Sequence, residues 1–148
     1  MRAARLPTGT VTFLFTDIER STQLLKRLGK SYGDLLAEHR RILRAAAHDH
    51  GGEEVDTQGD SFLFAFRRAD EAARAAVDAQ RALATHEWPE STDVRIRMGL
   101  HTAEPSASDE GYFGLGLHRA ARIMSAARGG QILVSLAASS VLEDAARR

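Results

Sequence analysis

Two aspartates stand where strand-like segments end, and they are the first candidates for chemistry. Asp17 follows the β-branched and aromatic run 10–16, and Asp60 lies in the turn of a hairpin predicted from 54–56 and 61–66. If these strands are neighbours, the two carboxylates converge at one edge of a sheet. Paired carboxylates are a typical way to hold hard divalent cations beside phosphates. The structural alternative is that each aspartate caps a helix or a turn.

The helix predicted after Asp17 offers a second chemical function. The first backbone N–H groups of a helix have no partner inside it, so this end attracts anions. The candidate seat for a triphosphate consists of the five residues that follow, Ile18, Glu19, Arg20, Ser21 and Thr22.

A helix predicted over 115–127 carries the third candidate group. His118 and Arg122 are four residues apart, so they share one face of this helix. An arginine directed at a phosphate offsets negative charge that develops in a transition state. Taken alone, the two residues are more typical of a solvated surface arginine and a hydrogen-bonded histidine than of a catalytic pair.

These groups depend on a small set of elements to position them. The predicted strands are 10–16, 54–56, 61–66, 94–100 and 131–135. The predicted helices comprise one or two segments between Leu24 and Gly51, one around 72–83, and those at 115–127 and 136–146, with a loop at 103–111. The order β-αα-β-β-α-β-α-β-α predicts an α+β sandwich. We expect a ferredoxin-like core with a mixed, mainly antiparallel sheet and helices packed on one face.

Composition narrows the class of protein. The chain has 148 residues, 43% hydrophobic and 27% charged, which is typical of one globular domain spanning 1–148. Its 20 basic and 20 acidic residues cancel, which disfavours binding to nucleic acid. The absence of cysteine excludes disulfides and fits the cytoplasm, and no apolar run is long enough to span a membrane. We therefore expect a cytoplasmic domain with no membrane segment.

Five ordered segments together resemble the catalytic domain of class III adenylyl and guanylyl cyclases of the bacterial type. Phe15-Thr16-Asp17-Ile18-Glu19 resembles the first metal motif of that family, and Gly59-Asp60-Ser61-Phe62 resembles the second. The other three segments are Arg97-Met98-Gly99-Leu100-His101-Thr102, Tyr112-Phe113-Gly114 with Ala120-Ala121-Arg122-Ile123, and Gly129-Gly130-Gln131-Ile132-Leu133-Val134-Ser135.

The resemblance implies a lyase that converts ATP or GTP to the 3′,5′-cyclic monophosphate and pyrophosphate in cyclic-nucleotide signalling. It implies a homodimer with active sites at the interface and two Mg²⁺ or Mn²⁺ ions in each site. One subunit would supply the metal ligands Asp17, Ile18 and Asp60, and also the base-reading residue Asp56. The other subunit would supply Gly111, His118 and the transition-state residue Arg122.

Several positions depart from the pattern of the family. Adenylyl cyclases usually carry lysine at the position of Asp56 and aspartate or threonine at that of Gly111, whereas guanylyl cyclases carry an acidic and a small residue there. A carboxylate accepts hydrogen bonds from guanine N1–H and its 2-amino group, so this pair leans towards guanine. Bacterial members are more often adenylyl cyclases, and the base stays open. His118 replaces an asparagine that orients the ribose, and Arg20 replaces a glycine.

The end of the chain also differs from the family. Two further strands and a phosphate-contacting lysine commonly follow, and no such lysine follows Val134. We therefore expect the domain to lack its last C-terminal strands.

Two other interpretations remain. Gly51-Gly52-Glu53-Glu54-Val55 resembles the turn motif of diguanylate cyclases, but here it precedes a strand, and Gly59 supplies the turn. The stronger alternative is a catalytically degenerate cyclase-homology domain that acts as a nucleotide-binding or dimerisation module. Asp56, Gly111 and His118 favour this alternative, whereas the intact Asp17, Asp60 and Arg122 favour catalysis.

Overall fold

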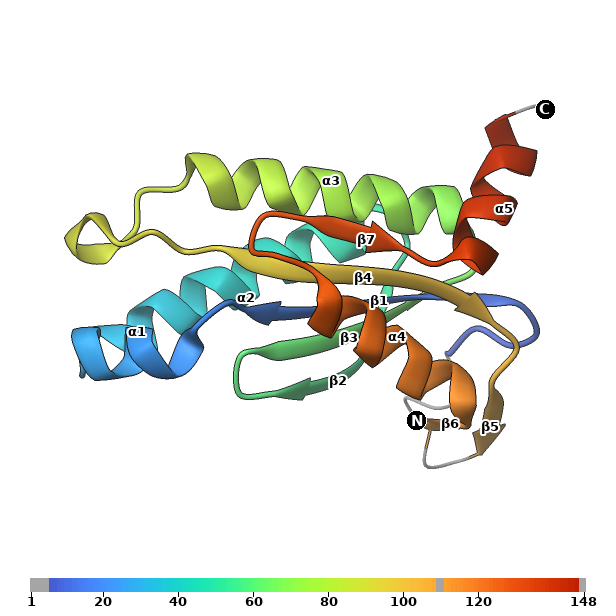
Figure 1. Cartoon of the computed structure of the whole chain (residues 1–148), viewed down its shortest axis with the longest axis horizontal. Helices are drawn as coiled ribbons and strands as arrows, with labels where there is room; N and C mark the ends of the chain where they lie inside the picture. Colours follow the sequence, from blue (N-terminus) through green and yellow to red (C-terminus); the bar gives the residue numbers. More distant parts are fainter. Residues whose placement is uncertain (1–5, 109–110, 147–148) are drawn as a thin grey trace.

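A five-stranded sheet organises the chain in the computed structural model, which describes residues 6–108 and 111–146 (Figure 1). The strands are β1 (Val11–Ile18), β2 (Glu53–Gln58), β3 (Ser61–Phe66), β4 (Ile96–Ala103), β5 (Ser106–Ser108), β6 (Gly111–Phe113) and β7 (Ile132–Val134). The helices are α1 (Ser21–Leu28), α2 (Ser31–Asp49), α3 (Ala69–Thr85), α4 (Leu115–Ala126) and α5 (Leu136–Ala146), with a short 3₁₀ turn at Pro89–Ser91.

The sheet has the order β2-β3-β1-β4-β7, with β1 at its centre. β1 runs antiparallel to both β3 and β4, and β2 and β3 form the predicted hairpin, while β7 is parallel to β4. The prediction of an α+β fold with a mixed, mainly antiparallel sheet is therefore confirmed. The register places Asp17 opposite Arg97 on β4, and Thr16 opposite Phe62 on β3.

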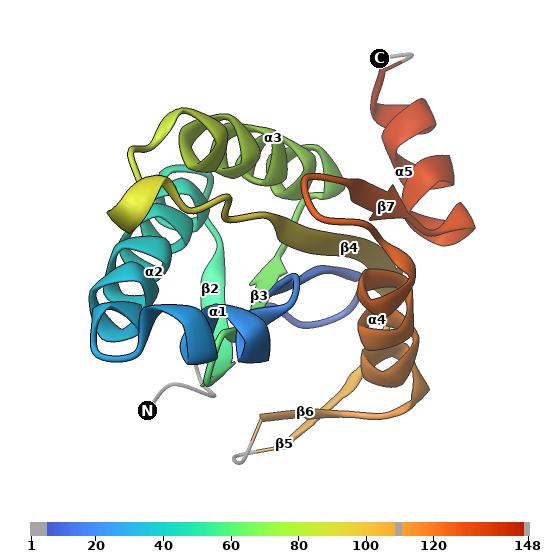
Figure 2. The same cartoon turned by 60° about the vertical axis from the view of Figure 1, so that its left-hand side comes forward.

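Helices cover both faces of the sheet, which corrects the expectation that they pack on one face (Figure 2). Alternate residues of a strand point to opposite faces. Leu14 and Ile18 of β1 join the large core beneath α1, α2 and α3. Phe13 lies on the other face, where it packs in a smaller cluster with Ala120 of α4. Asp17 has the same parity as Phe13, so its side chain belongs to the α4 face.

The break between α1 and α2 is set by a glycine. Gly29 has a φ of 55°, in the left-handed region that glycine adopts at little cost, and its N–H is donated to the Leu25 carbonyl. The segment predicted as one or two helices is therefore two. In α2, Leu35, Ile42 and Leu43 recur at helical spacing and are buried against the sheet.

A two-stranded ribbon, β5–β6, replaces part of the loop expected at 103–111. Three-residue strands carry too little alternation to be recognised in a sequence. The ribbon is fixed to the rest of the chain by Tyr112. Its hydroxyl donates to the Pro7 carbonyl at 2.5 Å, and its ring meets Phe13 edge-on at 5.1 Å between centroids.

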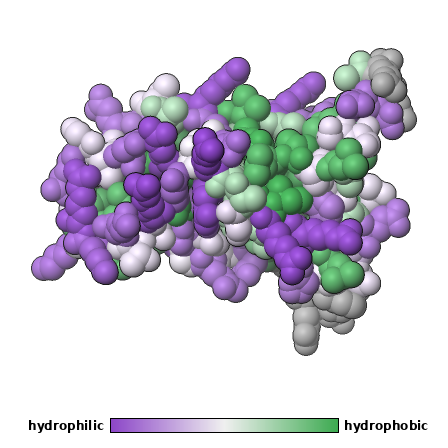
Figure 3. Space-filling model, viewed as in Figure 1, coloured by the Kyte–Doolittle hydropathy of each residue, from purple (hydrophilic) through white to green (hydrophobic). Residues whose placement is uncertain are grey.

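The two ends of the molecule differ in polarity. Hydrophilic side chains dominate the α1 end, whereas hydrophobic ones gather over β7 and the start of α5 (Figure 3). Exposed Val134 and Leu136 belong to that apolar region. Among the described residues, none of the helices is both long enough and apolar enough to traverse a bilayer.

Candidate active site

The two candidate metal ligands, Asp17 and Asp60, converge as the sequence predicts. The Asp60 carboxylate accepts a hydrogen bond of 2.8 Å from the backbone N–H of Ile18, the residue next to Asp17. Asp17 lies inside β1, and the residue at the N-cap position of α1 is Arg20. The alternative of Asp17 as a helix cap is therefore wrong.

Arg97 is the direct partner of Asp17, a contact that sequence reasoning did not find. Its Nε donates to Asp17 Oδ1 at 2.7 Å, and a second guanidinium nitrogen donates to Asp17 Oδ2. The Asp17 side chain is 13% exposed and that of Arg97 is 28% exposed, so solvent screens this bidentate pair only in part. The hydrogen bond with Asp17 raises the pKa of Arg97. The signal was available in the alternation of β4, which puts Arg97 on the face of Asp17 once the two strands pair.

The turn that carries Asp60 is anchored from α2. Arg40 donates from a guanidinium nitrogen to the Gly59 carbonyl at 2.6 Å. Gly59 has a φ of 58°, so the hairpin turn needs the left-handed conformation that glycine supplies. Together, the turn and the arginine hold Asp60 beside the end of β1.

The segment predicted as a phosphate seat leads into the start of α1, and one of its members is engaged elsewhere. Ser21 and Thr22 begin the helix as expected. Glu19 donates its backbone N–H to the Arg95 carbonyl at 2.8 Å, and its carboxylate accepts from the backbone N–H of Gly129. The Glu19 side chain therefore ties the residues just before α1 to the loop before β7.

The carboxylates at this site fit a magnesium-type ion that shares its coordination with a substrate. Within 6–108 and 111–146, no group of three or more histidine, aspartate or glutamate side chains is placed to enclose a metal. Mg²⁺ rarely needs such a cage, because it is usually bound by one or two carboxylates together with water and phosphate oxygens. Asp17 and Asp60 provide that donor set, provided that Arg97 releases Asp17.

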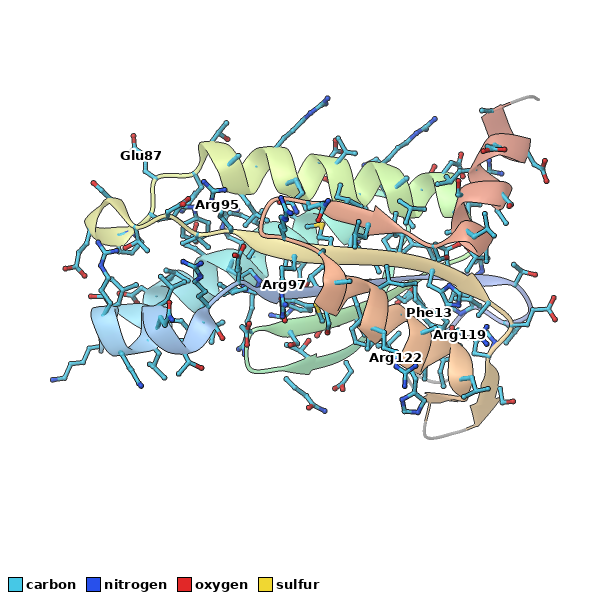
Figure 4. The ribbon with its side chains drawn as sticks, viewed as in Figure 1. Phe13, Glu87, Arg95, Arg97, Arg119 and Arg122 are labelled. Carbon is cyan, nitrogen blue, oxygen red and sulfur yellow. The ribbon has the colours of Figure 1, made fainter. Side chains whose placement is uncertain are left out.

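His118 and Arg122 lie on one exposed face of α4, as predicted, but apart from the aspartates. They line a shallow depression with Leu115, Arg119, Ala121 and Ser125. In the described part of the chain neither side chain makes a hydrogen bond or ion pair. Figure 4 shows Arg97 near the middle of the sheet and Arg122 projecting from α4, further from the α1 end. One copy of the chain therefore displays the two aspartates and the two α4 side chains as separate groups.

The candidate base-reading residues are also on separate elements. Asp56 is exposed on the edge strand β2, where its carboxylate accepts from the Thr57 N–H at 2.9 Å and from Gln58 Nε2 at 3.0 Å. Gly111 opens β6, paired with Ser108 across the ribbon.

Comparisons with known proteins show which family the chain matches. The adenylate and guanylate cyclase catalytic domain matches residues 4–148. An uncharacterised protein of Mycobacterium tuberculosis is 37% identical over 138 residues, which cover 92% of this chain and 46% of that protein. A receptor-type adenylate cyclase of Trypanosoma congolense is 34% identical over 170 residues, covering 86% of this chain and 23% of its own length.

Solved structures agree with this match. An adenylate cyclase from Trypanosoma brucei, solved in its monomeric state, superposes with a TM-score of 0.83 at 29% identity, covering 90% of this chain and 76% of that chain.

The chain spans less than half the length of the two sequence relatives, the Mycobacterium tuberculosis protein and the Trypanosoma congolense cyclase.

Proposed function

Because the chain belongs to the adenylate and guanylate cyclase catalytic domain family, we propose that it converts ATP or GTP to the 3′,5′-cyclic monophosphate and pyrophosphate. The observation that carries the proposal is the junction of Asp17 and Asp60 through the Ile18 N–H. It brings two carboxylates to the start of a helix, where a triphosphate and its cations are accommodated together.

The protein's own groups have distinct tasks in this reaction. Two Mg²⁺ or Mn²⁺ ions held by Asp17, Asp60 and the Ile18 carbonyl would activate the ribose 3′-hydroxyl and neutralise the triphosphate. The start of α1 at Ser21 and Thr22 would orient the phosphates through its free N–H groups. Once Asp17 is no longer its partner, the two Arg97 nitrogens that bonded it are free to pair with phosphate oxygens, while the third donates to the Ser125 carbonyl.

The second half of the site would come from another copy of the chain. Arg122 and His118 are exposed, have no partner within the described residues, and do not contact the aspartates of their own chain. In a homodimer that sets α4 of one subunit against β1 and the hairpin of the other, Arg122 would meet the α-phosphate and His118 the ribose. Loss of such a transition-state donor typically costs about a hundredfold or more in kcat.

The base is read by Asp56 and the space at Gly111 in this proposal. The Asp56 carboxylate bonds only to its immediate neighbours along β2, so it can turn to a ligand at small cost. As an acceptor it matches the N1–H and 2-amino group of guanine, donors that adenine lacks.

A second candidate function is regulation without catalysis by a nucleotide-binding or dimerisation domain. The observation that favours it is the Asp17–Arg97 pair, because this contact occupies the carboxylate that a metal needs. The two functions differ in whether a metal ion displaces Arg97 from Asp17.

The decisive experiment supplies the purified chain with Mn²⁺ and either ATP or GTP, and separates the products by chromatography. We expect a cyclic nucleotide, formed in a metal-dependent manner at concentrations where a dimer is demonstrated by sedimentation. Asp17→Ala should remove turnover while the circular dichroism spectrum is retained. No product from either nucleotide in a confirmed dimer would overturn catalysis and favour the regulatory function, and turnover in Asp17→Ala would overturn the metal assignment.

A further inference from the structure

A pocket of about 520 Å³ lies beside α1, at the hydrophilic end of the molecule. This volume is in the range of small-molecule sites. Its walls come from α1, from the segment that leads into β4, and from the loop before β7. The lining residues are Glu19, Arg20, Gln23, Leu24, Arg27, Asp93, Arg95, Arg128 and Gly129.

The charges of this pocket are unbalanced. Arg95 is paired with Asp93 at 2.8 Å, and Glu19 accepts from the Gly129 N–H. In the part of the chain that the structure describes, the guanidinium groups of Arg20, Arg27 and Arg128 have no hydrogen-bond or ion-pair partner. The lining has four arginines against two carboxylates, those of Glu19 and Asp93, so this concave space carries a net charge of +2, although the whole chain has a formal net charge of zero. Arginine binds phosphate through parallel N–H bonds, so such a cluster favours a phosphate group over water.

The pocket borders the predicted triphosphate seat, with which it shares Glu19 and Arg20, but it is separate from the proposed metal ligands. Neither Asp17, Asp60 nor Arg97 lines it. Gln23 and Arg27 are four residues apart, so they present one face of α1 to the pocket. Figure 4 shows Arg95 on the segment before β4, further towards the α1 end than Arg97.

The backbone around the pocket is fixed by tight contacts. A Cβ atom built on Gly129 would lie 1.9 Å from Glu19 Oε2 and 2.4 Å from the Arg95 Cβ, so only glycine fits there. The loop that carries Arg128 is therefore locked against α1 and the start of β4. A rigid frame of this kind reduces the ordering that a ligand must impose on binding.

We propose that this pocket binds a small phosphate-bearing anion with at least two negative charges. The shared chemistry is a phosphate group held by the guanidinium groups of Arg27 and Arg128, with Arg20 at the rim next to the start of α1. The anion comes either from the reaction itself, as a diphosphate, or from a separate phosphorylated metabolite. Binding needs no divalent metal, and it does not depend on the proposed cyclase activity.

The test is a titration of the ¹⁵N-labelled chain in EDTA with pyrophosphate in one arm and ribose 5-phosphate in the other. We expect saturable shifts of the backbone amides of Gln23 and Gly129. Arg27→Ala and Arg128→Ala should each weaken binding about tenfold, the usual effect of one charge-assisted contact. Binding of pyrophosphate alone would identify a diphosphate as the ligand, and binding of both would identify the terminal phosphate as the recognised group.

Lys26→Ala is the matched control, because Lys26 is an exposed cation of the same helix that does not line the pocket. It removes the same charge and should change the affinity less than about twofold. The proposal is overturned if neither anion gives saturable shifts up to about 10 mM, near the weak limit of specific affinities. It is also overturned if the double Arg27→Ala, Arg128→Ala variant binds as tightly as the unchanged chain. Since no metal is present and no turnover is measured, this result is independent of the test for cyclase activity.

Discussion

At the scale of single residues, the pair of Asp17 and Arg97 defines the resting state of the site. A mostly buried carboxylate needs a counterion, because an unpaired charge in such a place is costly. Arg97 satisfies this need through two hydrogen bonds. A metal ion that binds Asp17 would take over the same task, and the released Arg97 would then need a phosphate as its new partner.

His39 should make the chain sensitive to acid. His39 belongs to α2, and its side chain is fully buried. Among the described residues, neither of its ring nitrogens has a hydrogen-bond partner of ordinary geometry. Burial lowers the pKa of His39 from 6.5 to about 4, against the attraction of Asp60. The unfolded chain therefore binds more protons between these two values, and stability is lost as the pH falls through this window. The loss amounts to roughly 3 kcal/mol of unfolding free energy.

Replacing the ring by an apolar side chain of similar size checks this prediction. In His39→Leu, the urea concentration at which half of the protein is unfolded should change much less between pH 7 and pH 4 than in the unchanged chain. If this midpoint changes equally with pH in both proteins, the acid sensitivity belongs to other groups.

Arg20 carries backbone strain. It lies at the N-cap of α1 with a φ of 58° and a ψ of 39°, and its side chain makes no capping hydrogen bond. The left-handed conformation costs a non-glycine residue about 1–2 kcal/mol. Arg20→Gly should therefore raise the free energy of unfolding by about 1 kcal/mol, after the greater entropy of glycine in the unfolded chain is taken into account. Chemical denaturation checks this, and a fall in stability would show that the Arg20 side chain makes a compensating contribution.

At the scale of elements, most of the fold could be predicted because its signals are local. The run that became β1, the break at Gly29, and the hairpin turn at Gly59 each carry a pattern within a few residues. The predicted strand 94–100 is displaced from β4, Ile96–Ala103, because its pairing with β1 extends to Ala103, which no local pattern indicates.

The parts that were missed depend on contacts between distant segments. Arg97 reaches Asp17 across 80 positions, and Glu19 reaches Gly129 across 110. The ribbon β5–β6 is held by Tyr112 against Phe13 and Pro7, far away in the chain. Such contacts become visible only when the sheet register is known.

The packing of α4 on β4 yields a prediction at this scale. A Cβ atom at Gly99 would lie 2.4 Å from the Met124 backbone nitrogen and 2.8 Å from its Cα, so the helix would have to move. Gly99→Ala should lower the free energy of unfolding by about 1–3 kcal/mol, the usual cost of overpacking. Thermal and urea unfolding measure this change.

Gly33→Ala provides the matched control. Gly33 lies in α2, and no atom lies within 4 Å of the position that its Cβ would take. Alanine in a helix is favoured over glycine by about 0.5–1 kcal/mol, so the same substitution should be stabilising there. Equal effects at both glycines would contradict the role assigned to close packing at Gly99.

At the scale of the whole molecule, the site residues are divided between two surfaces. Asp17 and Asp60 lie at the hairpin end of β1, and His118 and Arg122 lie on the outer face of α4. Among the described residues, no hydrogen bond or ion pair joins either aspartate to His118 or Arg122, and the proposed dimer would bring the two surfaces together from separate copies. The symmetry of such a dimer gives it two equivalent sites.

Mixing two inactive variants tests this division. Asp17→Ala and Arg122→Ala chains, each inactive alone, should recover about a quarter of full activity, because half of randomly formed dimers contain one intact site of two. Asp17→Ala mixed with Asp60→Ala should recover none, since both changes affect the same half-site. The absence of recovery in a confirmed heterodimer of the first pair would mean that each chain carries a complete site.

The unequal hydrophobic clusters on the two faces of the sheet also divide the molecule by local stability. Three helices bury the larger cluster on one face, whereas a single helix, α4, covers the smaller cluster on the other. Segments with few buried contacts open without global unfolding. Backbone amides of α4 should therefore exchange with deuterium before those of α2 and α3. The half of the molecule that keeps its amides protected would thus act as the scaffold, and the half proposed to associate with a second copy would retain the freedom to adjust.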